Sequence, residues 1–411
     1  MKKLSTIAIL LLLSSLFLLG QNPEAQVKKA RAAIKDFDIP TADAAYKAAM
    51  KLAIDEDEYK TIEVEWKELE KVNILLADGR RSLERNEYDE SLRKYSNAIA
   101  QMDASKQDVW GKVKGEAYYS KGMVLFRQES PIEAAAEFKS AMAFDREEPK
   151  FAKAIEMVRN KHYSEGHKFY KRKDYVSAKE QYAIAVAVDP SFASGFYQLA
   201  LIAKLDGDLK ASENFYRDAV TSDPTHYKGW YGLGSLYYSM GNNNKAIEAL
   251  KMSISINSNY ERAYYVLGQV YDSQKNEKLA IQNLIKAIEV DKGYLRAYEL
   301  LAKIYIDQED YDATISLLKG LTGSATSYKT YYRLSQAYNG QENFSSALSA
   351  ATKALKLKRN WAPALIEKGD ALRGLGKNKE AVQSYRVAAE DARWKSVSEY
   401  RIDELTKWEG R

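Results

Sequence analysis

Residues able to carry covalent or metal chemistry are scarce in this chain of 411 residues, which contains three histidines and no cysteine. Without cysteine there are no disulfides, no thiolate metal sites and no cysteine nucleophile. His162 and His167 lie five residues apart, a poor spacing for one helix face, and the HExxH zinc-protease pattern is missing. No glycine-rich loop follows a strand-like segment, so a phosphate-binding loop is missing too. We therefore expect no metal and no other cofactor, and we expect that the protein is not an enzyme.

The charged residues are balanced in number and are not concentrated in one part of the chain. Lys and Arg total 62 and Asp and Glu total 57, which gives a net charge of +5. Acidic neighbours such as Asp55 and Glu56 have no partner at a spacing that would suit acid–base catalysis, and such groups on helices are usually solvated. A nucleic-acid-binding domain would need basic residues gathered on one face. We therefore expect no nucleic-acid partner.

The first twenty residues have the features of an export signal. Lys2 and Lys3 precede an apolar run that begins at Ile7, and Gly20 stands before polar chain. This order is typical of a secretory signal peptide, although Leu18 fits the usual cleavage pattern poorly. The alternative is an uncleaved membrane anchor, for which the run is short, because a span needs about 20 apolar residues. We expect cleavage, no membrane span in the remaining chain, and export to the periplasm or exterior of a bacterial cell.

A repeat of 34 residues predicts the elements that position the other side chains, with three equal blocks beginning at Ala193, Tyr227 and Glu261. In each block, positions four, seven, eight and eleven are apolar or small, and positions 20, 24 and 27 form a second such stripe. Both spacings follow one helix face. A turn at position fifteen, Gly207 or Gly241, ends the first helix. Each block is therefore predicted to be a helical hairpin, and stacked hairpins bury a continuous core and present a long concave face.

The same register extends to both sides of these blocks and divides the chain. Further units begin near Val72, Gly115, Arg159, Leu295, Tyr328 and Ala362, and the first two are about ten residues longer than the rest. We expect these extra residues to lengthen helices. The predicted regions are a signal peptide (1–20), irregular hairpins with long helices (21–148), a regular array (149–391) and a C-terminal helix (392–411).

The C-terminal region has an apolar stripe of its own. At 100° per residue, one helix face would carry Trp394, Val397, Ile402, Leu405 and Trp408. We expect this helix to cap the last hairpin, because an open array needs a cap. The alternative is a docking helix or a helix through which two copies form a homo-oligomer.

The repeat resembles the tetratricopeptide repeat (TPR) over about residues 72–391. The residues that carry the resemblance best are Trp230, Leu233, Gly234, Tyr237, Ala246 and Leu250, together with Asp-Pro at 189–190 and 223–224. Ser212 and Thr314 depart from it, because they replace the alanine at position twenty. The resemblance implies an all-α fold, an α-solenoid of antiparallel helix hairpins that forms a right-handed superhelix.

The resemblance also implies which residues would contact a ligand. In this family the first helix of each hairpin lines the concave groove through positions two, five, nine and twelve. Transferred to this chain, these positions give the candidate groove residues Tyr197, Lys228, Tyr231, Ser235, Tyr238, Arg262, Tyr265, Gln269, Asp272, Arg296, Lys303, Lys329, Tyr332, Gln336 and Asn339.

These residues suggest that the groove binds an extended peptide or protein segment of unknown identity. Lys and Arg would meet carboxylates, and tyrosines supply contact area at low entropic cost. The competing interpretation is that tyrosine at position five is a common repeat residue and that the bases are solvated. The family's carboxylate clamp for chaperone tails uses Lys at position five and Asn at position nine, which this chain lacks.

We therefore interpret the chain as an exported protein–protein interaction scaffold that aids assembly of an envelope complex. One alternative is a glycan-binding module, because tyrosine faces with Gln, Asn and Asp also suit sugars. Added salt would distinguish it, because salt weakens charge-dependent peptide binding. Another alternative is an accessory subunit that docks through its convex face or its C-terminal helix.

Overall fold

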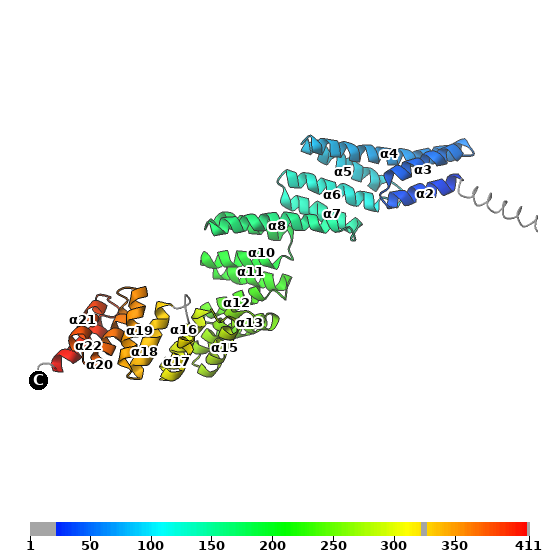
Figure 1. Cartoon of the computed structure of the whole chain (residues 1–411). Coiled ribbons are helices and arrows are strands. Elements are labelled where there is room, and N and C mark those ends of the chain that lie inside the picture. Colours follow the sequence, from blue (N-terminus) through cyan, green and yellow to red (C-terminus); the bar gives the residue numbers. More distant parts are fainter. Residues whose placement is uncertain (1–21, 322–326, 409–411) are drawn as a thin grey trace, which may run out of the picture. The chain divides into compact units, whose positions relative to one another are not determined.

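The computed structural model describes residues 22–321 and 327–408, which form 21 α-helices and no strand (Figure 1). They divide into two compact units, one up to Asp223 and one from Pro224 onward. In each unit consecutive helices pair as antiparallel hairpins, and the predicted all-α solenoid is confirmed. The expected signal peptide lies outside the described residues. Within them no helix is both long and apolar enough to cross a membrane.

Unit 1 contains five hairpins. Their helices are α2 (Pro23–Lys35) and α3 (Ile39–Leu52), α4 (Glu56–Glu84) and α5 (Tyr88–Ala104), α6 (Gly111–Arg127) and α7 (Pro131–Phe144), α8 (Pro149–Lys171) and α9 (Tyr175–Val188), and α10 (Ala193–Leu205) and α11 (Leu209–Ser222).

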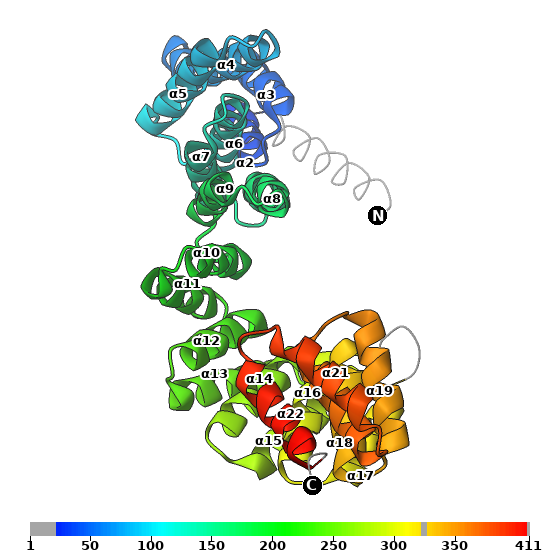
Figure 2. The same cartoon turned by 90° about the vertical axis from the view of Figure 1, so that its left-hand side faces the viewer.

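Unit 2 contains five hairpins and a last helix (Figure 2). The helices are α12 (Tyr227–Ser239) and α13 (Asn243–Ile256), α14 (Glu261–Ser273) and α15 (Glu277–Val290), α16 (Leu295–Asp307) and α17 (Tyr311–Lys319), α18 (Tyr328–Gly340) and α19 (Phe344–Leu357), α20 (Ala362–Gly374) and α21 (Asn378–Ala389), and α22 (Lys395–Trp408).

The turn inside each hairpin has one backbone geometry. Position fifteen of every predicted unit takes a positive φ, although only three of these residues are glycine: Asn86, Glu129, Lys173, Gly207, Gly241, Lys275, Glu309, Glu342 and Gly376. Phe37 adopts the same conformation between α2 and α3. The next residue often caps the second helix, as when Asn242 Oδ1 accepts a hydrogen bond from the Lys245 amide at 3.3 Å. The turn therefore supports the predicted register independently of the apolar pattern.

Small residues at position eight allow the two helices of a hairpin to touch. A Cβ atom on Gly234 would lie 2.6 Å from Leu250 Cγ, and one on Gly268 would lie 2.9 Å from Leu284 Cγ. Both leucines are fully buried. A side chain at position eight would therefore overpack the contact between the helices.

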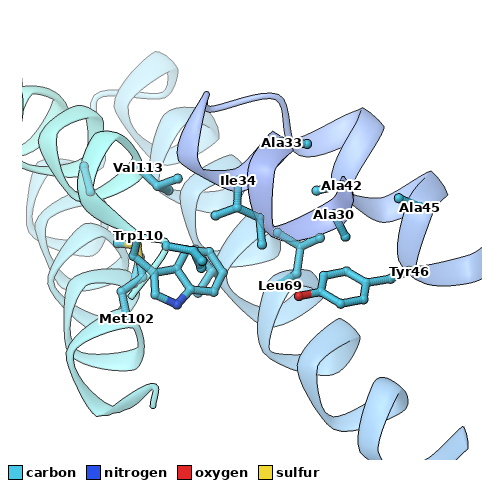
Figure 3. Packing of buried hydrophobic residues seen from close by; sticks show 14 of the residues in the cluster. Ala30, Ala33, Ile34, Ala42, Ala45, Tyr46, Leu69, Met102, Trp110 and Val113 are labelled. Atoms are coloured by element: carbon cyan, nitrogen blue, oxygen red, sulfur yellow. The ribbon is translucent and has the colours of Figure 1, made fainter. Parts of the chain in front are cut away.

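The first hairpins of unit 1 are longer than the others, as predicted. Helix α4 has 29 residues and continues without a break through Gly79, and α8 has 23. Only part of the extra chain extends helices, because residues 105–110 form a loop that places Trp110 in the core beside Met102 and Val113 (Figure 3). This loop was not predicted, because it has no counterpart in the regular repeats.

Helix α22 packs against α21 at the end of unit 2. Leu405 is 9% exposed and belongs to a cluster of buried residues that Trp394 and Ile402 also contact. Val397 was predicted on this packed face and is instead 41% exposed, close to Tyr400 at 62%. The side chain of Trp408 lies outside the described part of the chain.

Candidate functional site

The candidate residues of unit 2 lie on the first helices of its hairpins, which together form the first-helix face (α12, α14, α16, α18 and α20). Neighbouring first helices contact one another directly, since α12 meets α14 and α18 meets both α16 and α20. A residue at position five can therefore reach the residue at position two of the following hairpin. Three such pairs lie in succession on this face.

The first pair is Tyr231 on α12 and Arg262 on α14. The Tyr231 ring packs edge-on against Tyr260, with 5.1 Å between ring centroids, and is half-buried. The Arg262 side chain is 59% exposed, and its Nε lies 3.5 Å from the carboxylate of the adjacent Glu261. Interaction with the hydroxyl groups of Tyr260 and Tyr231 raises the pKa of Arg262. The guanidinium therefore lies beside the tyrosine rings and remains open to solvent.

The second pair, Tyr265 on α14 and Arg296 on α16, repeats this arrangement. Tyr265 packs edge-on against Tyr294 at 5.4 Å between ring centroids. Burial raises the pKa of Tyr294 to about 12, and the charges of Arg296 and Arg262 oppose that rise. Both guanidinium groups therefore lie near the Tyr294 hydroxyl. Arg296 is exposed and forms no ion pair with any described residue.

The third pair differs because Glu299 takes the place of tyrosine at position five. Its carboxylate lies 3.6 Å from Lys329 Nζ and accepts a hydrogen bond from the Ser327 hydroxyl at 2.7 Å. Lys303, another candidate base on α16, is paired with Asp307 at 2.6 Å. The two candidate bases of this region are therefore paired with the chain's own carboxylates.

Aromatic contacts return on α18, but without an open base at position two of the next helix. Tyr332 packs against Trp361 at 4.9 Å, and Tyr328 packs against the same ring at 4.7 Å. Lys358 Nζ lies 4.6 Å from the centroid of Tyr328. Position two of α20 is Pro363, which cannot supply a positive charge.

Amide side chains of α18 hold a buried carboxylate on α20. Asn339 Nδ2 donates to Glu367 Oε2 at 2.8 Å, and Gln336 also bonds to this carboxyl group. Burial raises the pKa of Glu367 to about 7, and the nearby Asp370 adds to the rise. Asp370 in turn accepts a hydrogen bond from the Tyr385 hydroxyl at 2.7 Å and lies 3.5 Å from Arg401 Nε. This end of the face therefore consists of polar groups that satisfy one another.

The remaining candidates have less distinctive surroundings. Lys228 is exposed, with its Nζ 5.9 Å from the centroid of Tyr227. Burial raises the pKa of Tyr238, and Asp272 adds to this effect. Tyr197 belongs to unit 1, where its ring contacts Tyr216 at 5.8 Å. Two candidates, Ser235 and Gln269, are half-buried at position nine.

An aromatic residue at position 34 was missed by the sequence reasoning and completes the site. The position-five tyrosine contacts it in four hairpins, through Tyr163–Phe192, Tyr231–Tyr260, Tyr265–Tyr294 and Tyr332–Trp361. The recurrence of an aromatic residue at this position could have shown it. Tyrosine at position five thus packs the repeat and also borders the exposed face, so the two interpretations of it are compatible.

The histidines have separate structural contacts and do not converge. His162 Nδ1 lies 2.8 Å from Gln181 Oε1, His167 Nδ1 lies 2.6 Å from the Tyr182 hydroxyl, and His226 Nδ1 accepts from the Gly229 amide at 3.1 Å. Among the described residues no group of three or more histidine or acidic side chains could hold a metal ion.

Comparison with known proteins identifies the repeat. Residues 261–294 and 328–360 match one model of the tetratricopeptide repeat, residues 163–227 match a second, and residues 234–275 match a TPR repeat model. No curated protein matches the chain in sequence.

Solved structures of similar fold cover half of the chain or slightly more. A tetratricopeptide repeat protein from Parabacteroides merdae is 19% identical, with a TM-score of 0.43, over 60% of this chain and 98% of its own. PilF of Pseudomonas aeruginosa is 17% identical, with a TM-score of 0.45, over 51% of this chain and 96% of its own. PilW, described as a widely conserved type IV pilus biogenesis factor, is 16% identical, with a TM-score of 0.43, over 52% and 98%.

Proposed function

Because the chain contains tetratricopeptide repeats, we propose that it is an exported interaction scaffold whose first-helix face in unit 2 binds an extended segment of a protein partner. We further propose that this binding aids assembly of a complex in a bacterial cell envelope. Export is supported by the basic and apolar start of the sequence.

The observation that carries the proposal is the repeated Tyr–Arg pair. In both pairs a half-buried tyrosine ring is fixed by an aromatic neighbour and an exposed guanidinium lies beside it. Fixed rings lose little conformational entropy when a ligand packs on them. Exposed arginines can form paired hydrogen bonds with carboxylates. The arrangement repeats along successive helices, which suits an extended chain better than a compact ligand.

Site-specific crosslinking in the native organism tests the binding face. A photo-crosslinking amino acid at Tyr231 should capture a protein partner, and the same amino acid at the exposed Lys278 of α15 should not capture that partner. Replacement of Tyr231 and Tyr265 by Ala should abolish partner recovery while the helix content is retained. Unchanged recovery with the double variant would rule out the first-helix face as the binding surface.

A second function through α22 is favoured by its exposed residues. Val397 and Tyr400 lie on the side of α22 that does not pack on the array. If this side is the docking surface, Tyr400→Ala should reduce partner recovery while Tyr231→Ala leaves it unchanged. The two variants therefore separate the two proposals.

A further inference from the structure

The distance between the two Tyr–Arg pairs restricts the segment that can contact both. Helices packed side by side are about 8–10 Å apart. Residues of α12 and α14 approach within 8 Å, so one step along the first-helix face is about 10 Å by this geometry. The charges of both Arg262 and Arg296 act on the hydroxyl of Tyr294, which lies between the two pairs.

Backbone geometry decides which extended conformation fits this step. In a β-strand, residues on the same side are two apart and about 6.7 Å distant, or four apart and about 13 Å distant. In a polyproline-II helix the rise is about 3.1 Å with three residues per turn, so every third residue faces the same side at about 9.3 Å. Only the second spacing matches the step of the face.

The third pair indicates which chemical group belongs beside each base. There the base is Lys329, and the chain itself provides a carboxylate, Glu299, at 3.6 Å. In the first two pairs a tyrosine stands where Glu299 stands in the third, so no carboxylate of the chain occupies the corresponding place. A ligand carboxylate would complete the same ion pair with Arg262 and with Arg296.

We propose that the two Tyr–Arg pairs of unit 2 bind a segment in polyproline-II conformation whose Asp or Glu residues recur at every third position. The aromatic rings suit such a segment, because proline-rich chains dock on aromatic surfaces and lose little entropy on binding. The proposal rests on the proposed function and names the chemical class of its ligand.

Peptides of one composition and different order test the spacing. The probes are fluorescein-labelled (Glu-Pro-Pro)4 and a peptide with four consecutive Glu followed by eight Pro, with (Lys-Pro-Pro)4 as the charge control. Fluorescence anisotropy with the full mature chain at low salt should show about tenfold tighter binding of the first peptide than of the second, which corresponds to about 1.4 kcal/mol. The Lys peptide should not bind.

Variants then assign the preference to the two pairs. Arg262→Gln and Arg296→Gln should each remove most of the difference between the two acidic peptides. Lys278→Gln, which removes one positive charge from the exposed surface of α15, should leave the difference unchanged. The circular dichroism of each variant should match that of the unmodified protein.

Each other outcome has a defined meaning. Equal binding of both acidic peptides, weakened by the Arg variants, would overturn the every-third-residue spacing and leave the proposed function in place. A preference that survives both Arg variants would overturn the assignment to these pairs. If neither acidic peptide binds at millimolar concentration, the inference is wrong, and crosslinking at Tyr231 decides the proposed function separately.

Discussion

The first-helix face of unit 2 differs between its two halves. From α12 to α16 it carries tyrosine rings beside exposed arginines. From α16 to α20 its charged groups are paired within the chain, through Glu299–Lys329, Asn339–Glu367 and Asp370–Arg401. The two halves are built on the same repeat, and the difference arises from a few positions whose side chains do not determine the fold.

This contrast indicates that a repeat array can divide its surface between recognition and internal stabilisation. Exposed ion pairs contribute little to stability, about 0–1 kcal/mol. The second half therefore gains little stability from Glu299–Lys329, but its base is already neutralised for an acidic ligand. The first half keeps its charges available.

Reversing the charge of the first half should give the largest effect. The double variant Arg262→Glu and Arg296→Glu should weaken binding of (Glu-Pro-Pro)4 by more than about 100-fold, near 2.7 kcal/mol, because attraction becomes repulsion at both positions. Exchange of the third pair, Glu299→Lys with Lys329→Glu, keeps one ion pair and should change binding less than about twofold by the same measure. Fluorescence anisotropy compares the two, and equal losses would contradict the division into halves.

Removing the buried carboxylate of the second half should change stability in a pH-dependent way. The folded state raises the pKa of Glu367 from 4.5 to about 7, so folding favours its protonated form. That stability is complete below the unfolded value of 4.5 and is lost as the pH rises through 7. The groups that face Glu367 are Tyr332, Gln336 and Asn339 on α18, Asp370 on α20 and Arg401 on α22.

Glu367→Gln should therefore stabilise unit 2 by about 2 kcal/mol at pH 8 and have little effect at pH 4. Urea unfolding followed by tryptophan fluorescence at both values of pH measures the difference. Glu380→Gln, at an exposed position of α21, is the control and should show no such dependence. A gain of the same size at pH 4 would show that the carboxylate charge is not the cause.

Converting the third pair into the chemistry of the first two should extend the recognition surface. Glu299→Tyr removes the carboxylate that neutralises Lys329 and supplies a ring beside it. We expect (Glu-Pro-Pro)4 to bind about fivefold tighter, near 1 kcal/mol. Glu299→Gln frees the lysine without adding a ring and should give a smaller gain. If the gain from Glu299→Tyr persists when Lys329 is also replaced by Gln, the base is not responsible.

Backbone strain in the hairpin turns should give the smallest effect and should leave recognition unchanged. Glu342 takes a φ of 57° in the turn after α18, whereas Gly241 takes 76° in the turn after α12. Glu342→Gly should stabilise the fold and Gly241→Ala should destabilise it, each by no more than about 1 kcal/mol, because side chains disfavour positive φ. Thermal unfolding measures both variants, and a change in peptide affinity would link the turns to the binding face.

The sequence predicted the fold well because the repeat imposes the same contacts in each hairpin. Gly234 against Leu250 and the positive φ at position fifteen follow from position alone. The loop that holds Trp110 could not be predicted, because it occurs once and has no register. Val397 was misplaced because helical periodicity gives a stripe and does not show where the packed partner ends.

The candidate site was predicted at the level of positions and not of contacts. Tyr231, Tyr265, Arg262 and Arg296 were chosen one helix at a time. Their grouping depends on residues 31 positions apart in successive repeats, a separation that becomes a contact only when the hairpins stack. For the same reason Lys329 was expected to be available, although Glu299 on the preceding helix neutralises it.

The common turn at position fifteen has a consequence for how such a protein evolves. Each hairpin closes on itself with one backbone conformation that asparagine, glutamate, lysine and glycine all adopt here. A gene duplication that copies one period therefore inserts a module whose closure does not depend on its neighbours' identity. If the inserted module carried a tyrosine at position five and a base at position two, the lineage would gain recognition of about three more ligand residues. Partner length could thus be selected in whole steps, without redesign of the core.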